Sequence, residues 1–159
     1  MQEGPLELTE GGVAPDFEMK DKHGQTKKLS DLRGKAAVVV YFYPQDFTPG
    51  CTTEANEFTR DYEKFKGAGI EIVGVSPDDE VSHDKFRQNM GIPYPLVSDT
   101  KNEVSKKYGV YGLKKFMGRE YTGVNRTTFL VDKTGKIVKT FKKVKSAGHS
   151  QEVFQALRG

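Results

Sequence analysis

Cys51, the single cysteine of the chain, is the residue whose type and position are best suited to chemistry. It lies between a loop that begins at Pro44 and a helical pattern that runs to Gly67. The first amides of a helix lack intrahelical partners and lie at the positive end of the helix dipole, so this position favours a thiolate over a thiol. The position therefore indicates a reactive nucleophile, and a small buried hydrophobe is the alternative.

The residues just before Cys51 favour the reactive interpretation. Pro44 and Pro49 stiffen the loop that would hold the sulfur, because proline fixes its own backbone torsion. Thr48 places a hydroxyl three residues before the cysteine, and we expect it to donate to the thiolate or to a bound oxygen if the loop turns back.

Two elements must position this cysteine. Residues 36–43 are apolar on both faces and rich in β-branched and aromatic side chains, which predicts a buried central strand that ends at Pro44. The helix that follows should bury one face, and Cys51 belongs to that face. Its other apolar members recur at four- and three-residue steps: Ala55, Phe58, Tyr62 and Phe65.

The remaining pattern alternates strands with helices and predicts an α/β fold. Strands are expected at 16–19, 70–76, 94–97, 127–132 and 136–141, with a single helical turn at 30–34. Helices are expected to open at 76–78, around 104–108 and over 151–157, the last burying Val153, Phe154 and Leu157. We expect a mixed, partly parallel sheet with helices on both faces. Sites in such sheets form at the carboxyl ends of strands, where Cys51 lies.

Length and composition bound the rest of the interpretation. The 159 residues predict one domain over 13–159 after a short polar tail at 1–12. The net charge of +3 is small, so neither nucleic acid nor a membrane is expected as a partner. A basic cluster at Lys139, Lys142, Lys143 and Lys145 is expected to be a solvated strand end. A lone cysteine suits a reducing compartment, and we expect a cytoplasmic protein.

The three histidines are not predicted to bind a metal. His23, His83 and His149 are far apart in the chain and match no metal-ligand spacing, so each is expected to be a surface or loop residue. The sequence also shows no phosphate-binding glycine loop and no haem motif. We therefore expect no metal and no cofactor.

The residues around Cys51 resemble the active-site motif of the peroxiredoxins, Pro44-x-x-x-Thr48-x-x-Cys51. The wider stretch, residues 42–54, resembles the bacterioferritin-comigratory-protein or Q-type branch of that family. Further similarity lies at 14–17, 30–35, 74–76 and 126–132, so the resemblance covers nearly the whole chain from residue 13 onward.

This resemblance implies an embellished thioredoxin fold and a peroxidase activity. Cys51 would be the thiolate that attacks a hydroperoxide and becomes a sulfenic acid. Thr48 would orient the peroxide and Pro44 would shield the sulfur. Arg126 would stabilise the thiolate and the charge that builds on the oxygens, although without the resemblance it would be taken for an exposed edge residue. Glu54 would either fix Arg126 or serve only as an acid in the first helical turn.

The chain departs from many relatives at Asn56, where they carry a resolving cysteine. Because no other cysteine exists, an intramolecular disulfide cannot form. The resemblance then implies a one-cysteine cycle that uses an external thiol such as thioredoxin or glutathione, and easier over-oxidation to sulfinic acid. Many relatives of this branch are monomers, so a monomer is expected.

Two other functions remain open at this point. A thiol-based redox sensor or binding protein on the same scaffold would use oxidation of Cys51 to alter partner contacts. A disulfide reductase of the thioredoxin type is disfavoured, because Cys51 is followed by Thr52, Thr53 and Glu54 and not by a Cys-x-x-Cys pair.

Overall fold

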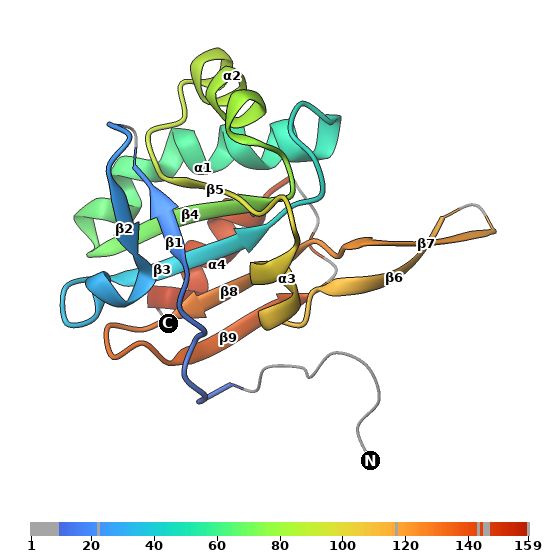
Figure 1. Cartoon of the computed structure of the whole chain (residues 1–159). Helices are drawn as coiled ribbons and strands as arrows, with labels where there is room; N and C mark the ends of the chain where they lie inside the picture. The colour runs from blue at the N-terminus through green and yellow to red at the C-terminus, as the bar shows by residue number, and fades with distance from the viewer. Residues whose placement is uncertain (1–9, 22, 117, 143, 145–146, 159) are drawn as a thin grey trace.

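The computed structural model describes residues 10–21, 23–116, 118–142, 144 and 147–158 (Figure 1). Its strands are β1 (Glu18–Lys20), β2 (Thr26–Lys28), β3 (Ala37–Phe42), β4 (Ile70–Ser76), β5 (Leu96–Ser98), β6 (Tyr111–Phe116), β7 (Arg119–Val124), β8 (Thr127–Val131) and β9 (Ile137–Lys142). Its helices are α1 (Pro49–Gly67), α2 (Glu80–Met90), α3 (Glu103–Lys107) and α4 (His149–Arg158), with a 3-10 turn at Leu29–Leu32.

Seven strands form the central sheet, in the order β2-β1-β5-β4-β3-β8-β9. β3 pairs in parallel with β4, and β4 pairs in parallel with β5. The outer pairs, including β3 with β8 and β8 with β9, are antiparallel. The predicted mixed sheet is therefore confirmed, with its parallel strands in the centre and antiparallel strands on both sides.

β3 is buried on both faces, as its unbroken apolar run predicts. Side chains alternate across a strand, so successive residues enter different cores. Val39, Tyr41 and Tyr43 pack into one core and Val38, Val40 and Phe42 into the other. β3 therefore runs through the middle of the molecule and ends at the loop that leads to Cys51.

The two faces of the sheet are covered differently. α1, α2 and α4 supply Phe58, Phe86 and Phe154 to the core on one face. The N-terminal segment, the 3-10 turn and the residues flanking α3 supply Phe17, Leu29 and Tyr108 to the other. Helices on both faces were predicted, but the long ones all lie on a single face (Figure 1). Among the helices of the described residues, none is long and apolar enough to cross a membrane.

The sequence pattern predicts neither strand of the β6–β7 hairpin, which projects away from the body (Figure 1). The strands pair antiparallel, with Tyr111 opposite Val124 and Phe116 opposite Arg119. Most described side chains of β7 are exposed. Burial on one face produces the alternating pattern by which a strand is recognised, and here that burial is missing.

Other expectations need smaller corrections. α2 begins at Glu80 and not at 76–78, because Asp79 caps it by accepting from the Ser82 amide at 2.8 Å. The short strand β2 was not predicted. Of the expected tail, residues 1–9 lie outside the described residues, and Gly11 and Gly12 hydrogen bond to Ile137 of β9.

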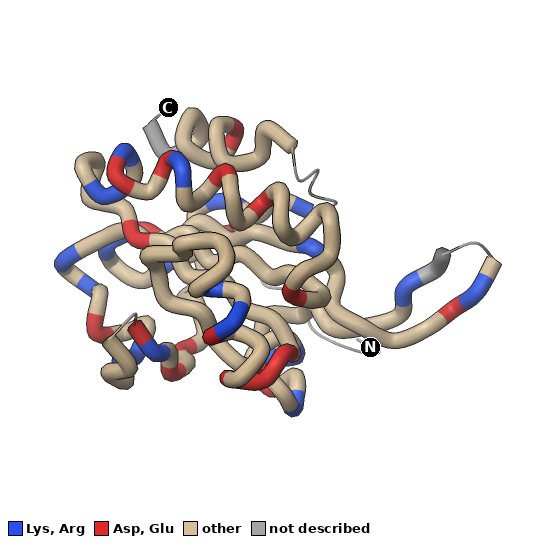
Figure 2. Tube along the Cα trace, turned by 90° about the horizontal axis from the view of Figure 1, so that it is seen from above, with Lys and Arg blue, Asp and Glu red and all other residues tan. Residues whose placement is uncertain are grey.

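Positively and negatively charged residues are interspersed along the chain trace (Figure 2). In the predicted basic cluster, Lys139 and Lys142 are exposed on β9, while Lys143 and Lys145 lie outside the described residues. The side chain of Leu157, expected to be buried in α4, is likewise not described, whereas Val153 and Phe154 are buried as predicted.

Candidate active site

Cys51 is the third residue of α1, directly beyond the carboxyl end of β3, as predicted. Thr48 is the N-cap residue and Pro49 takes the first helical position, where its missing amide costs no hydrogen bond. The Cys51 side chain belongs to the apolar core, and the residue is 1% exposed. The sulfur is therefore held in a protected place near the positive end of the helix dipole.

Arg126 lies against the sulfur. One guanidinium nitrogen, Nη2, donates to Cys51 Sγ at 3.3 Å, and Nη1 donates to Glu54 Oε1 at 2.8 Å. Arg126 directly precedes β8, and β8 pairs with β3 so that Thr127 lies opposite Phe42. The sheet pairing thus brings a cation from 75 positions away in the chain to the start of α1. The edge-residue alternative for Arg126 is wrong, since its side chain is only 19% exposed.

Glu54 lies in the second turn of α1 and is 1% exposed, so the alternative of a first-turn acid is also wrong. Burial raises its pKa to about 7, and the charge and hydrogen bond of Arg126 act in the opposite direction. For Arg126, burial lowers the pKa, but Glu54 and Cys51 together outweigh it and raise the pKa above its ordinary value. One guanidinium therefore joins a buried carboxylate to the sulfur by charge-assisted hydrogen bonds.

Thr48 and Pro44 both lie half-buried at the edge of a cavity of about 470 Å³ between this loop and the hairpin, termed here the loop cavity. The Thr48 hydroxyl donates to the Gln45 carbonyl at 3.0 Å. The expected hydrogen bond from this hydroxyl to the Cys51 sulfur is therefore not formed. Its oxygen lone pairs remain available to accept a hydrogen bond from a ligand.

The loop before Cys51 is anchored by Asp46, a buried residue that sequence reasoning missed. Its carboxylate accepts from Tyr43 Oη at 2.7 Å and from Ser82 Oγ at 2.8 Å, and its amide donates to Asp78 Oδ2 at 2.7 Å. The next residue, Phe47, has φ of +65°, a conformation that a bulky side chain rarely adopts. These bonds tie the loop to α2 and hold it in a strained shape.

Two histidines expected at the surface are buried. The two ring nitrogens of His83 are hydrogen-bonded to Ser76 Oγ and Ser98 Oγ. Burial lowers the pKa of His83 to about 4, so the ring is neutral. His149, the first residue of α4, is hydrogen-bonded through Nε2 to Thr128 Oγ1 of β8 at 2.8 Å. The spacing of the histidines in the sequence does not indicate whether they are buried, because burial depends on which elements cover each residue. Only His23 is exposed as expected.

The fold brings Asp46, Asp78 and His83 together, with potential ligand atoms within 4.8 Å of one another, although their spacing matches no metal motif. The Asp46 and Asp78 carboxylates accept hydrogen bonds from hydroxyls of Tyr43, Ser82 and Ser76, and His83 Nε2 is paired with Ser76 Oγ. These hydrogen bonds account for the cluster as an anchor of the loop.

Lys114 of β6 is a second cation at the site and was not predicted. Burial and Arg126 lower its pKa, and the nearby Cys51 acts against them. Its ammonium group donates to the Val124 carbonyl at 2.8 Å. Lys114 could have been assigned to the site only if the β6–β7 hairpin had been predicted, and the sequence pattern does not reveal this hairpin.

The sequence matches the AhpC/TSA family over residues 11–140. It is 45% identical to peroxiredoxin Bcp of Bacillus subtilis over 93% of this chain and 94% of that protein. It is 36% identical to peroxiredoxin Bcp of Escherichia coli over 95% of this chain and 96% of that protein.

Solved structures show the same fold. The bacterioferritin comigratory protein of Xanthomonas campestris, described for its alkyl peroxide reduction activity, superposes with a TM-score of 0.82 at 37% identity, covering 89% of this chain and 90% of that one. BcpB of Mycobacterium tuberculosis gives a TM-score of 0.82 at 32% identity, covering 95% and 97%. The predicted thioredoxin-like peroxiredoxin fold is confirmed.

A buried cysteine at a helix start with a guanidinium on its sulfur, on this fold, defines a thiol-dependent peroxidase. The chain belongs to the AhpC/TSA family and, within it, to the Bcp or Q-type peroxiredoxins.

Proposed function

We propose that the protein reduces hydroperoxides at Cys51 and is recycled by a thiol from outside the chain. The observation that carries this proposal is the hydrogen bond from Arg126 Nη2 to Cys51 Sγ, with Glu54 holding the other end of the guanidinium. A fixed cation at a buried sulfur stabilises the thiolate and any oxyanion that forms beside it. The alkyl peroxide reduction described for the Xanthomonas campestris relative supports the same chemistry.

In the first half-reaction the Cys51 thiolate attacks the terminal oxygen of R–O–O–H. The S–O bond forms as the O–O bond breaks, so sulfur is oxidised to the sulfenic acid and the peroxide is reduced. The leaving alkoxide takes a proton from solvent and departs as an alcohol, or as water when the substrate is hydrogen peroxide. We assign a role to each of three residues. Arg126 stabilises the negative charge that develops on the oxygens, Thr48 accepts a hydrogen bond from the peroxide, and Pro44 shields the sulfur.

In the second half-reaction an external thiol attacks the sulfenic sulfur, water leaves and a mixed disulfide forms. A second thiol then releases the Cys51 thiolate and the disulfide product. The chain has one cysteine. Asn56, at the position where many relatives carry the resolving cysteine, lies on the exposed side of α1, while Cys51 is buried. A protein thiol such as thioredoxin or a small thiol such as glutathione would serve. Such thiols abound in the cytoplasm, where we place the activity.

The proposal is tested by stopped-flow mixing of the reduced protein with one equivalent of hydrogen peroxide, followed by intact mass measurement. We expect rapid addition of one oxygen, no addition in Cys51→Ser, and a rate lowered about 10²- to 10³-fold in Arg126→Ala, the usual effect of removing one oriented donor. Return to the starting mass on addition of thiol would establish the cycle. A wild-type rate no faster than that of a free thiol would refute a peroxidase.

A redox sensor is the second candidate, favoured by the absence of any second cysteine in the chain. Both functions require the peroxide step, so recycling decides between them. If the peroxide step limits the rate of turnover at millimolar thiol, recycling is fast and the result supports a peroxidase. A sulfenic acid that persists for minutes under those conditions, together with a change in partner binding, supports the sensor.

A further inference from the structure

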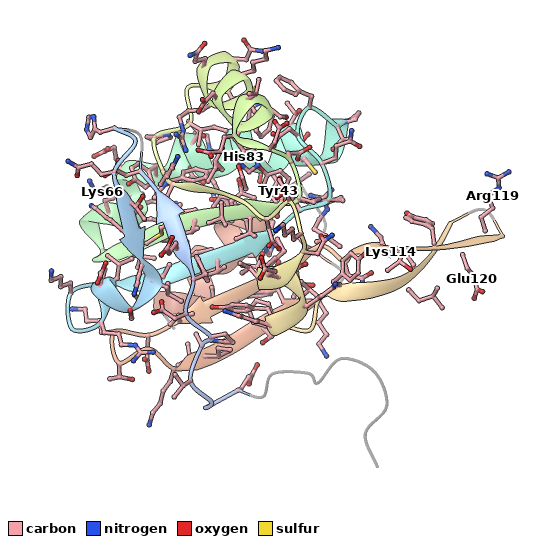
Figure 3. All side chains as sticks on the ribbon, in the orientation of Figure 1. Tyr43, Lys66, His83, Lys114, Arg119 and Glu120 are labelled. Carbon is pink, nitrogen blue, oxygen red and sulfur yellow. The ribbon has the colours of Figure 1, made fainter. Side chains whose placement is uncertain are left out.

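Lys114 has no part in the reaction described above, yet it lies at the active site. Figure 3 shows it on the part of the hairpin nearer the body, with Arg119 and Glu120 at the far end. Its pKa responds to both Arg126 and Cys51, which places its charge within electrostatic range of the reacting sulfur. A lysine half-buried beside a second cation is electrostatically costly unless an anion compensates it.

A cavity of about 410 Å³, termed here the Arg126 cavity, lies beside Lys114. Its lining combines three cations with apolar surface, namely Lys114, Arg126, Lys142, Val110, Phe129 and Val144. No acidic residue is among the lining residues that the structure describes. The volume suits a small organic molecule, and the charge suits an anion with an apolar body.

The charge in this cavity is not equally available from each cation. Arg126 is already paired with the buried Glu54 and with Cys51. The Lys114 ammonium contacts two neutral groups, the Val124 carbonyl at 2.8 Å and the Tyr121 ring at 5.7 Å from its centroid, while Arg126 acts against its charge and Cys51 in favour of it. These contacts orient the ammonium without neutralising it. Lys142, the third cation, is exposed on β9 and has an interaction of its own, so Lys114 is the cation that we expect a ligand carboxylate to meet.

Lys114 also lines the loop cavity, together with Pro44 and Thr48. Among the described lining residues of that cavity it is the one that carries a charge. Lys114 therefore lines both the Arg126 cavity and the loop cavity. Because Arg126 contacts the sulfur and lines the same cavity as Lys114, we expect that a molecule with its reactive end at the sulfur places another part of itself near this ammonium.

We propose that the Arg126 cavity is a subsite for a small organic carboxylate and that Lys114 is its specificity-determining residue. The inference rests on the proposed function, since the bound molecule is one of the two reactants. Either the hydroperoxide or the reducing thiol can carry the carboxylate, and the chemistry of recognition is the same for both. The ammonium pairs with the carboxylate, and the apolar lining covers the aliphatic body.

The first test is independent of peroxidase activity. Binding of hexanoate and of hexanol to the reduced full-length protein is compared by NMR titration. We expect the carboxylate to bind about tenfold more tightly, the effect of one charge-assisted hydrogen bond. Lys114→Met should remove this preference, and Lys114→Glu should reverse it in favour of hexylamine. Arg119→Met, which removes a cation from the far end of the same hairpin, is the matched control and should retain the preference.

The second test identifies the reactant. Reduction of the sulfenic acid is measured with mercaptopropionate and with mercaptoethanol, and oxidation of Cys51 with an aliphatic carboxylate hydroperoxide and with its methyl ester. The ratio of Lys114→Met to wild-type rates cancels the intrinsic reactivity of each reagent. A ratio about tenfold lower for the charged member of the thiol pair or of the peroxide pair supports the subsite and names its reactant.

Three results would overturn the inference. They are equal binding of hexanoate and hexanol, equal rate ratios within both pairs, and a wild-type preference that does not weaken at high salt, which screens a partly exposed ion pair. The salt series needs no variant, so misfolding of a substituted hairpin cannot hide the answer. Failure of the peroxide step in wild type would remove the proposed function, while the hexanoate titration would still decide whether the cavity binds carboxylates.

Discussion

Replacing Glu54 with glutamine should change how stability depends on pH. Glu54 is 1% exposed, and its folded-state pKa is about 7 against an ordinary value of 4.5. A carboxyl group with a raised pKa binds its proton more tightly when folded, so it favours the folded state increasingly as pH falls from about 7 to 4.5. Glutamine keeps the shape and the oxygen that accepts from Arg126, and it does not titrate.

The size of the effect follows from the pKa difference. At about 1.4 kcal/mol for each pKa unit, the free energy of unfolding of the wild type should rise by about 3 kcal/mol relative to Glu54→Gln between pH 7 and 4.5. The peroxide rate should move in the opposite direction, because protonation of Glu54 releases its charge-assisted hold on Arg126. Wild type should lose rate below pH 7 more steeply than the variant does.

Urea unfolding at a series of pH values, followed by far-ultraviolet circular dichroism, measures the free energies, and stopped flow measures the rates. Glu63→Gln, which changes an exposed acid on the same helix, is the matched control variant. A flat difference for Glu54→Gln over the same pH window would contradict the reasoning, because Glu54 would then not be a buried acid held against Arg126.

Three further predictions concern packing, the loop and the fate of the sulfur. Gly74→Ala should lower the free energy of unfolding by about 1–3 kcal/mol, since its Cβ would come within 2.9 Å of the Leu96 side chain, whereas Gly112→Ala, with open space, should lower it far less. Asp46→Ala should cost about 2 kcal/mol and slow the peroxide step, because two hydroxyls lose their acceptor; denaturation and stopped flow check both, and unchanged kinetics would exclude a role in holding the loop. Excess peroxide without thiol should add further oxygens at Cys51 in the intact mass, and a product that stops at one oxygen would contradict this expectation.

Much of the fold could be predicted from local pattern. The buried strand β3, the helix with Cys51 in its first turn and the β8–β9 hairpin all follow from runs and periods of apolar residues. Strands without a buried face could not be found in this way, and the β6–β7 hairpin is the clearest case. Its absence from the predicted elements also hid Lys114, because a cation on an unrecognised strand cannot be assigned to any site.

The sequence by itself determined that a lone cysteine begins a helix after a buried strand, flanked by Pro44 and Thr48, and that no second cysteine can resolve it. Tertiary structure alone decided what surrounds that sulfur. Arg126 reaches Cys51 only because β8 pairs with β3, and Asp46 and His83 are buried only because α2 folds over the loop. Local periodicity reports the path of the chain, whereas the electrostatic environment of a buried group depends on residues that are distant in sequence and neighbours in space.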